Sequence, residues 1–207
     1  YQSVRAVKKR ATMAVFFDAK KAFDTVWHSG LIVKMAKDGV PAQLIRLIGN
    51  WLTDRRLTVR VGKEFSEEVP LGSGVPQGSV ISPLLWNYWI GDCPATIIAH
   101  SGQSLYADDL SLWVTCDSWQ KGLIALNEEI ERLETWTRRK RLYLEPAKTS
   151  ALAIHPEKRI RNAIKAQPLW INKEKGLKIE WVEHAVLLGV TFSEDGTFDE
   201  HYRGVIK

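Results

Sequence analysis

The sequence is poor in cysteine and histidine. Its 207 residues include two cysteines, Cys93 and Cys116, and five histidines. Two cysteines cannot supply the disulfide framework of a small secreted domain, and none of the Cys and His spacings fits a zinc site. The chain must therefore depend on an ordinary hydrophobic core, for which its 45% hydrophobic fraction is sufficient.

Long apolar runs are also absent. The longest, residues 14–17 and the interrupted run 80–90, are too short or too polar to span a bilayer, and no signal peptide is visible. We therefore expect no association with a membrane. The chain begins with Tyr1 rather than methionine, which indicates a segment of a longer protein.

A large excess of one charge is missing as well. Lys and Arg number 29 against 24 Asp and Glu, a formal net charge of +5. A surplus of this size fits a polyanionic partner such as a nucleic acid, and it fits equally a basic surface without a partner. The basic runs 8–10 and 138–141 are interpreted as solvated faces, with contact to a nucleic-acid backbone as the alternative.

Strand-like and helix-like patterns are both present along the chain. Two apolar runs within residues 103–115 meet at Ala107, Asp108 and Asp109, a pattern that predicts a β-hairpin with acids at its tip. A second hairpin is predicted over residues 169–192, with 173–176 as its turn. The other predicted strands are residues 12–17, 57–61, 67–71 and 150–154, and the predicted helices are residues 31–36, 44–52, 79–90 and 118–140.

Three aspartates lie where carboxylates are costly. Asp18 ends an apolar strand, and Asp108 and Asp109 lie at the predicted hairpin tip. Such carboxylates need a neutralising cation, and oxygen ligands without nearby histidine or cysteine favour magnesium or manganese. If the two strands are neighbours, the acids can share a pair of ions, as phosphoryl transfer to a 3′-hydroxyl requires. An Asp-Asp pair by itself is more typical of a structural turn.

The residues around these acids decide between a metal site and a structural turn. Tyr106-Ala107-Asp108-Asp109 is identical to the YADD signature of reverse transcriptases. Residues 16–28 (FFDAKKAFDTVWH) resemble the first catalytic motif of that family, and residues 74–85 (GVPQGSVISPLL) resemble its template- and nucleotide-contacting motif. The three motifs follow one another in the family's order.

Weaker resemblance extends the match to roughly residues 12–201. The fourth palm motif is matched by Trp136, Leu142, Leu144, Lys148 and Thr149. Residues 187–190 (LLGV) resemble the primer grip, so Leu188 and Gly189 are expected to contact a primer, and His201 fits the start of the connection to the thumb. The sequence departs from the family at Glu145, where asparagine is common, and at Leu187, where tyrosine is common.

The resemblance implies a role for each matching residue of the metal site. Asp18 and Asp108 would bind two Mg²⁺ ions, with Mn²⁺ as a substitute, and Asp109 would support the same site. The backbone carbonyl of Ala19 would complete the shell of one ion. Lys148 would supply a proton or a positive charge to the departing pyrophosphate.

The resemblance also implies a nucleotide site. Phe23 would close over the sugar and exclude a 2′-hydroxyl, although position alone favours a core phenylalanine. Gln77 and Gly78 would lie against the incoming nucleotide and template, and Tyr106 beside the primer end. Read without the family, residues 74–78 are a structural loop, and Trp27 and His28 are structural in either reading.

The pattern around residues 22–28 and 78–80 is similar to non-LTR, LINE-type retrotransposons, especially jockey-like ones. A group II intron-type enzyme is the first alternative, but that group typically has Gly-Gly where this chain has Gly78-Ser79. A viral-type RNA polymerase usually carries a second Asp where Phe23 stands. A catalytically incompetent palm that only binds nucleic acid is the non-enzymatic alternative, against which all three acids are intact.

The implied fold is an α/β (α+β) polymerase palm, with an antiparallel sheet backed by helices 79–90 and 118–140. Residues 1–207 would be a reverse transcriptase fragment lacking most of the fingers and thumb. The palm would occupy about residues 12–160, and the primer-grip hairpin and start of the thumb connection about 168–207. The implied partners are an RNA template, a DNA primer, deoxynucleoside triphosphates and the rest of a polyprotein that includes an endonuclease. The expected location is intracellular, in the nucleus, and the isolated fragment is expected to be inactive.

Overall fold

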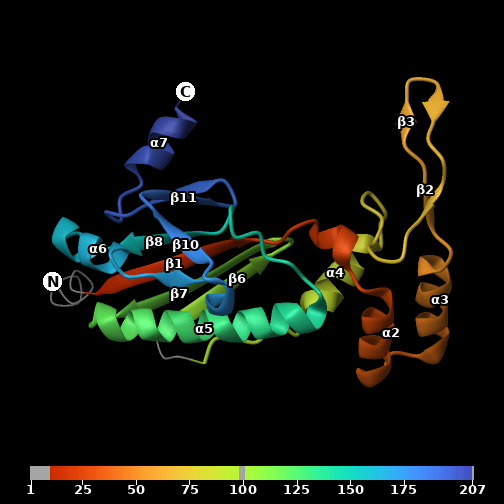
Figure 1. Ribbon diagram of the computed structural model, residues 1–207, viewed down its shortest axis with the longest axis horizontal. Helices are drawn as coiled ribbons and strands as arrows, with labels where there is room; N and C mark the ends of the chain where they lie inside the picture. Colours follow the sequence, from red (N-terminus) through yellow and green to blue (C-terminus); the bar gives the residue numbers. More distant parts are fainter. Residues whose placement is uncertain (1–9, 98–100, 207) are drawn as a thin grey trace. The chain divides into compact units, whose positions relative to one another are not determined.

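The computed structural model describes residues 10–97 and 101–206 (Figure 1). The described chain divides into two compact units. The first comprises residues 10–20, 93–97, 101–138 and 143–206. The second comprises residues 21–92 and 139–142.

A six-stranded sheet forms the first unit. Its order is β6-β7-β1-β8-β10-β9, and every neighbouring pair is antiparallel except β8 and β10, which are parallel. The strands are β1 (Ala11–Asp18), β6 (Ser101–Tyr106), β7 (Asp109–Cys116), β8 (Ser150–Ile154), β9 (Leu169–Trp170) and β10 (Lys178–Val182). The predicted strands 12–17 and 150–154 and the hairpin 103–115 are confirmed.

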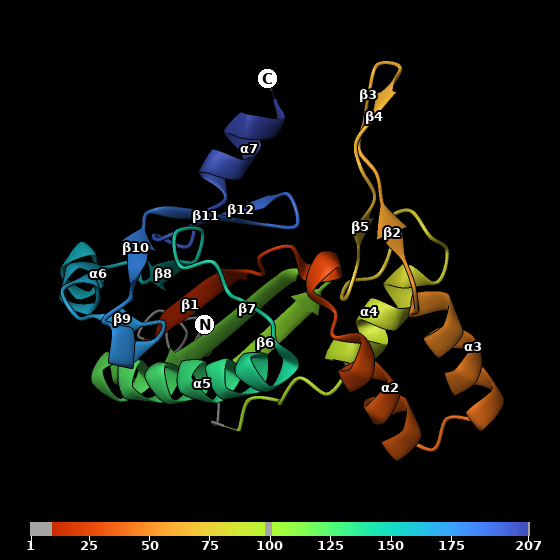
Figure 2. The same cartoon turned by 45° about the vertical axis from the view of Figure 1, so that its right-hand side comes forward.

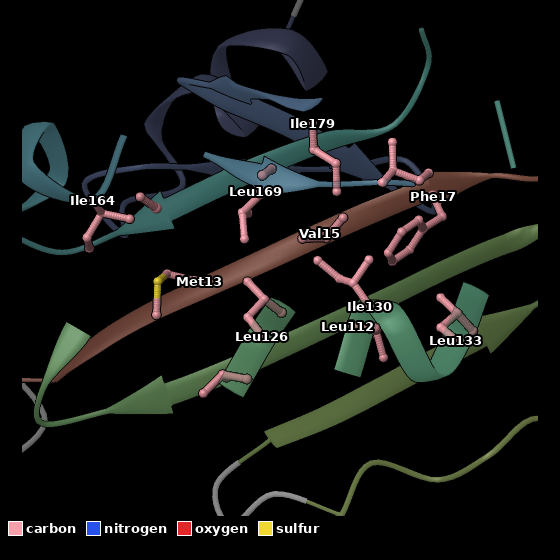
Figure 3. Packing of buried hydrophobic residues seen from close by; sticks show 14 of the residues in the cluster. Met13, Val15, Phe17, Leu112, Leu126, Ile130, Leu133, Ile164, Leu169 and Ile179 are labelled. Carbon is pink, nitrogen blue, oxygen red and sulfur yellow. The ribbon is translucent and has the colours of Figure 1, made fainter. Parts of the chain in front are cut away.

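One face of this sheet carries the hydrophobic core. Successive side chains of a strand point to opposite faces, so Met13, Val15 and Phe17 of β1 share one face. They pack with α5 (Trp119–Lys140), which supplies buried Leu126, Ile130 and Leu133, and with α6 (Lys158–Lys165), which supplies Ile164 (Figure 3). Figures 1 and 2 show α5 running along this face. The expected backing of the sheet by the helix 118–140 is therefore confirmed.

The opposite face carries the alternate residues of β1, including Phe16 and Asp18. A separate hairpin, β11 (His184–Leu187) and β12 (Val190–Ser193), lies on this side of the sheet (Figures 1 and 2). The rings of Phe192 and Phe16 lie 6.5 Å apart between centroids. The last helix, α7 (Asp199–Val205), follows this hairpin.

The prediction of one hairpin over residues 169–192 was wrong. The predicted turn at 173–176 does join β9 to β10, through a short 3-10 helix at Lys173–Lys175, but β11 and β12 form a second hairpin. Alternation alone did not separate them because both hairpins are short. Helix α6 was missed for a similar reason: it has eight residues, four of them basic.

The second unit is built from helices and a β-ribbon. The helices are η1 (Ala22–Thr25), α2 (His28–Lys37), α3 (Ala42–Leu52) and α4 (Ser82–Ile90). The predicted helix 79–90 begins later than expected, at Ser82, with Pro83 in its first turn, where the missing N–H costs nothing. The predicted strands 57–61 and 67–71 form an interrupted ribbon instead. Its short pairs are β2 (Arg56–Leu57) with β5 (Val69–Pro70), and β3 (Arg60–Val61) with β4 (Glu64–Phe65).

The basic run at residues 138–141 is not simply a solvated face. Lys140 is buried, with its Nζ 2.7 Å from Asp92 Oδ1 and 2.8 Å from the carbonyl oxygen of Trp89. The Arg141 guanidinium lies 3.9 Å from the centre of the Trp27 ring. Of the other basic run, residues 8 and 9 fall outside the described residues, and Arg10 pairs with Asp117.

No helix within residues 10–97 or 101–206 has both the length and the apolar character needed to cross a bilayer.

Gly122 of α5 tests the packing of the core. A Cβ atom at this position would lie 2.2 Å from Cys116 Sγ and 2.6 Å from Met13 Cε. Replacing a helical glycine with alanine ordinarily stabilises by about 1 kcal/mol. We expect Gly122→Ala to destabilise the first unit instead, by about 1–3 kcal/mol, because the core is overpacked. Hydrogen exchange of the α5 amides measures this change.

Gly49→Ala in α3 is the matched control, because the nearest atom to its new Cβ is Ile32 Cδ1 at 3.8 Å. This substitution should slow exchange of the α3 amides. Equal stabilisation by both substitutions would show that Cys116 and Met13 leave room for a methyl group at Gly122.

Candidate active site

The strand ends of the first unit bring the three aspartates together. Asp18 is the last residue of β1, Asp109 is the first residue of β7, and the two are directly opposite in the antiparallel register. Residues paired in this way point to the same face, with Cβ atoms about 5 Å apart. Asp108 precedes Asp109 in the two-residue turn that joins β6 to β7. The predicted gathering of acids at the hairpin tip therefore follows from strand pairing.

The charges at this edge repel one another. Partial burial raises the pKa of the Asp109 carboxyl, and the negative charges of Asp108 and Asp18 raise it further. A raised carboxyl pKa means that the ionised form is disfavoured where it stands. A cation at this edge would relieve that cost.

Lys148 supplies one such cation. Its Nζ lies 3.4 Å from Asp18 Oδ1 and 3.5 Å from Oδ2, although both side chains remain partly in solvent. The lysine is placed by a turn in which the Lys148 and Thr149 amides donate to the Glu145 carbonyl, and the Glu145 amide donates to the Asp18 carbonyl. The Glu145 carboxylate pairs with Lys20 at 3.3 Å, so the unusual glutamate has a local partner.

The backbone carbonyl of Ala19 lies next to Asp18, at the edge of the sheet that carries the three aspartates. Ala19 and Leu144 form an isolated antiparallel bridge. The hydrogen bonds flanking this bridge run from Lys20 N to Tyr143 O and from Glu145 N to Asp18 O. In this pattern the amide and carbonyl of Ala19 itself point away from the Tyr143–Glu145 segment.

The donor set fits divalent ions that prefer oxygen. Asp18, Asp108 and Asp109 and the Ala19 carbonyl are hard oxygen donors, and the mutual repulsion of the acids favours an added positive charge. The side chains are not drawn into a closed cage. Among the described residues, no group of three or more His, Cys, Asp or Glu is close enough to hold an ion as it stands.

The turn at the tip is strained. Ala107 has a φ of 52°, a left-handed conformation that costs a non-glycine residue roughly 1–2 kcal/mol. Beside it, Tyr106 is 64% exposed. Backbone strain of this kind is common at binding and catalytic sites.

The second unit brings Phe23, Gln77 and Gly78 into one structure. The Gly74 amide donates to the Val26 carbonyl and the Val75 amide to the Phe23 carbonyl, both at 2.8 Å. His28 Nε2 lies 2.7 Å from the Gly74 carbonyl oxygen, which makes that nitrogen the donor. These bonds fasten the predicted nucleotide loop to the segment that carries Phe23.

Side chains reinforce this attachment. Gln77 Nε2 donates to Asp24 Oδ1 at 3.3 Å, and the Phe23 ring stacks on Trp86 with centroids 5.4 Å apart. Gly74 has a φ of 89°, and a Cβ there would lie 2.8 Å from the Cα and carbonyl oxygen of Asp24. Only glycine fits this close approach.

Leu188 and Gly189 form the turn of the β11–β12 hairpin. Their φ values are 50° and 80°, the signs of a type I′ turn, in which asparagine and glycine are preferred. Leu188 is strained there, and the residue is 51% exposed. The predicted primer-grip residues thus lie at an exposed tip.

The sequence matches the family described as "Reverse transcriptase (RNA-dependent DNA polymerase)" over residues 2–192. This chain belongs to the reverse transcriptase family. It is 32% identical over 201 residues to "Probable RNA-directed DNA polymerase from transposon BS" of Drosophila melanogaster, covering 94% of this chain and 21% of that protein. It is 32% identical over 134 residues to "RNA-directed DNA polymerase from mobile element jockey" of the same species, covering 62% of this chain and 14% of that protein. The predicted kinship with non-LTR, jockey-like elements is confirmed.

The reverse transcriptase chain also resembles solved structures in fold. Apo telomerase from Candida tropicalis, truncated from its C-terminal domain, superposes with a TM-score of 0.58 at 12% identity, covering 91% of this chain and 35% of that chain. This likeness supports the α/β polymerase fold. The chain spans about a fifth of the length of the transposon BS protein.

Sequence reasoning did not find the bonds that hold the reverse transcriptase motifs in place. His28 was interpreted as structural, but its partner Gly74 is 46 residues away and no local pattern pointed to it. The hydrogen bond from Gln77 to Asp24 likewise joins residues that are far apart in the sequence. Both hydrogen bonds join residues of the recognised motifs, and membership in those motifs was the only feature of the sequence that pointed to them.

Asp109 tests the charge repulsion. Because its pKa is raised in the folded protein, the carboxylate destabilises the fold as pH rises through that pKa. Without divalent metal, Asp109→Asn should melt at a higher temperature than the unmodified protein at pH 7. The difference should shrink as pH falls toward about 4, where aspartates gain protons. Added Mg²⁺ should stabilise the unmodified protein more than the variant.

Asp117→Asn is the control for this comparison. Asp117 is an exposed acid paired with Arg10, so its neutralisation should give no gain in melting temperature. Lower stability of metal-free Asp109→Asn at pH 7 would contradict the proposed repulsion.

Proposed function

We propose that the protein containing this chain synthesises DNA on an RNA template by two-metal-ion nucleotidyl transfer. The observation that carries the proposal is the pairing of Asp18 with Asp109, with Asp108 in the adjoining turn, in a chain matching the reverse transcriptase family over residues 2–192. The metal is proposed to be Mg²⁺, with Mn²⁺ as a substitute, because the donors are all oxygens.

In this proposal the first unit supplies the reacting end. Asp18 and Asp108 would hold the ions, Asp109 would add negative charge to the same site, and the Ala19 carbonyl would serve as a further oxygen ligand. Two bound ions would activate the 3′-hydroxyl and stabilise the leaving pyrophosphate. Lys148, which pairs with Asp18, would supply a charge or a proton to the departing pyrophosphate.

The second unit is proposed to bind the incoming nucleotide. Gln77 and Gly78 form the exposed part of the loop that is fastened to the Phe23 segment, so the backbone can approach a nucleotide closely. Phe23 is half-buried, and its stacking on Trp86 gives it the fixed position that a steric gate needs. Tyr106, Leu188 and Gly189 are exposed and are assigned to the primer.

The parent protein is proposed to be a retrotransposon polyprotein. The named relatives are polymerases of a transposon and a mobile element, which favours this source over a group II intron. Its partners would be an RNA template, a DNA primer, deoxynucleoside triphosphates and the remaining segments, including fingers, thumb and an endonuclease. A nuclear location is part of the proposal, and imaging of the tagged parent protein tests it.

Loss of one metal ligand tests the reaction. In the parent protein, Asp108→Asn should reduce RNA-templated incorporation of deoxynucleotides by about three powers of ten, roughly 4 kcal/mol in barrier. Asp117→Asn, which changes an exposed acid just after β7, should leave the rate unchanged. An inactive parent with all three acids intact would instead favour the nucleic-acid-binding palm.

Phe23 tests the identity of the product. Phe23→Val in the parent protein should open space at the sugar while leaving the three acids in place. The ratio of kcat/KM for deoxy- and ribonucleotides should shift toward ribonucleotides by one to a few powers of ten, roughly 1.4–4 kcal/mol. An unchanged ratio would assign Phe23 to the core beside Trp86. A preference for ribonucleotides in the unmodified enzyme would indicate an RNA polymerase.

A further inference from the structure

A buried cluster of charges joins α6 to the residue that follows β12. Arg161 and Lys165 lie one helical turn apart on α6, and both face Glu194. Arg161 Nε lies 3.2 Å from Glu194 Oε1, and Lys165 Nζ donates to Glu194 Oε2. Their side chains are largely buried, at 10% exposed for Arg161, 21% for Lys165 and 16% for Glu194.

Both charge and backbone hold Glu194. Burial by itself would raise the pKa of its carboxyl, but the hydrogen bond and charge of Lys165, together with the charge of Arg161, hold the pKa below its ordinary value. The Glu194 amide donates to the Glu183 carbonyl, and the Glu194 carbonyl accepts from the His155 amide, both at 3.0 Å. The residue is therefore fixed at its side chain and on both sides of its backbone.

The same cluster reaches the end of β8. Arg161 Nη1 donates to the His155 carbonyl at 2.6 Å and to the Pro156 carbonyl at 3.0 Å. A buried ion pair contributes little net stability compared with well-packed apolar side chains of the same size. What it supplies here is a defined direction, because Lys165 hydrogen-bonds one carboxylate oxygen of Glu194 while Arg161 lies against the other. A fixed direction at Glu194 is suited to orienting the structural element that is attached to this residue.

The element attached to this point is the β11–β12 hairpin. Glu194 directly follows Ser193, the last residue of β12. The hairpin is a two-stranded sheet of its own and makes no ladder hydrogen bonds with the six-stranded sheet. Its placement therefore depends on the backbone hydrogen bonds of Glu194 and on side-chain contacts, of which the Phe192–Phe16 pair is one and the Glu194 cluster is another. Its tip, Leu188 and Gly189, lies about four strand residues away from Glu194, or roughly 13 Å.

We propose that Glu194 is a positioning residue for DNA synthesis, which fixes through Arg161 and Lys165 the direction in which the β11–β12 hairpin holds a primer end against β1. The inference rests on the proposed contact of Leu188 and Gly189 with the primer. A small rotation at Glu194 moves the tip by a larger distance, because the hairpin acts as a lever. The primer end, rather than the nucleotide, is what such a movement displaces.

Kinetics of the parent polymerase test this proposal. Glu194→Gln leaves two basic side chains without their anion and loosens the base of the hairpin. We expect the KM for primer–template to rise about tenfold, which is 1.4 kcal/mol, with the KM for deoxynucleotides unchanged. Glu183→Gln, an exposed glutamate in the turn before β11, is the matched control and should behave as the unmodified enzyme.

Each outcome separates the alternatives. A fall in kcat with both KM values unchanged would mean that Glu194 only supports folding, and this result would overturn the proposal. If Glu194→Gln does not fold, Glu194→Asp keeps the charge with a shorter reach and should give an intermediate primer KM. A primer KM equal to that of the unmodified enzyme would count against the proposal.

Leu188→Ala tests the proposed contact between the hairpin and the primer separately from Glu194. If it raises the primer KM and Glu194→Gln does not, the hairpin contacts the primer but Glu194 does not aim it. If neither does, the proposed role of the hairpin fails.

Discussion

The register between β1 and β7 is the constraint on which the candidate active site depends. The pairing runs unbroken from Ala11 opposite Cys116 to Asp18 opposite Asp109. Strand side chains alternate between faces, so a slip of one residue would turn Asp18 toward α5 and Phe16 into the core. The burial of Met13, Val15 and Phe17 against α5 prevents such a slip. Apolar packing on one face of the sheet therefore sets the position of the acids on the other.

Several features at this face work against stability. Asp109 repels Asp18 and Asp108, and Ala107 and Leu188 have left-handed backbone conformations at two separate turns. Strained or mutually repelling residues lower stability, so proteins retain them mainly where binding or chemistry requires them. Lys148 lowers part of the electrostatic cost through its pairing with Asp18. In the proposed reaction, substrate and metal would displace this pair and leave the Lys148 ammonium available to the departing pyrophosphate.

In the second unit, hydrogen bonds fix the position of a loop that has no regular secondary structure. Residues 74–78 contain two glycines and a proline and form no regular element of their own. Backbone bonds to Val26 and Phe23, with the imidazole of His28 on the Gly74 carbonyl, replace the missing ladder. Gln77 and Gly78 of this loop are left exposed while its base is fixed. Positioning of this kind supplies much of the rate in phosphoryl transfer.

The sequence by itself determined the family, the central strands and the long helix, because the motifs and the apolar periods are local. It also identified Asp18, Asp108 and Asp109 as one group, since a strand end and a hairpin tip are readable signals. The tertiary structure alone decided the split of the tail into two hairpins, the burial of Lys140, and the bonds from His28 to Gly74 and from Glu194 to Arg161 and Lys165. These contacts join residues tens of positions apart, 46 for His28 and Gly74, and a polar pair leaves no periodic trace in the chain. Which charged side chain meets which is settled only when packed helices and strands bring them within a few ångströms of each other.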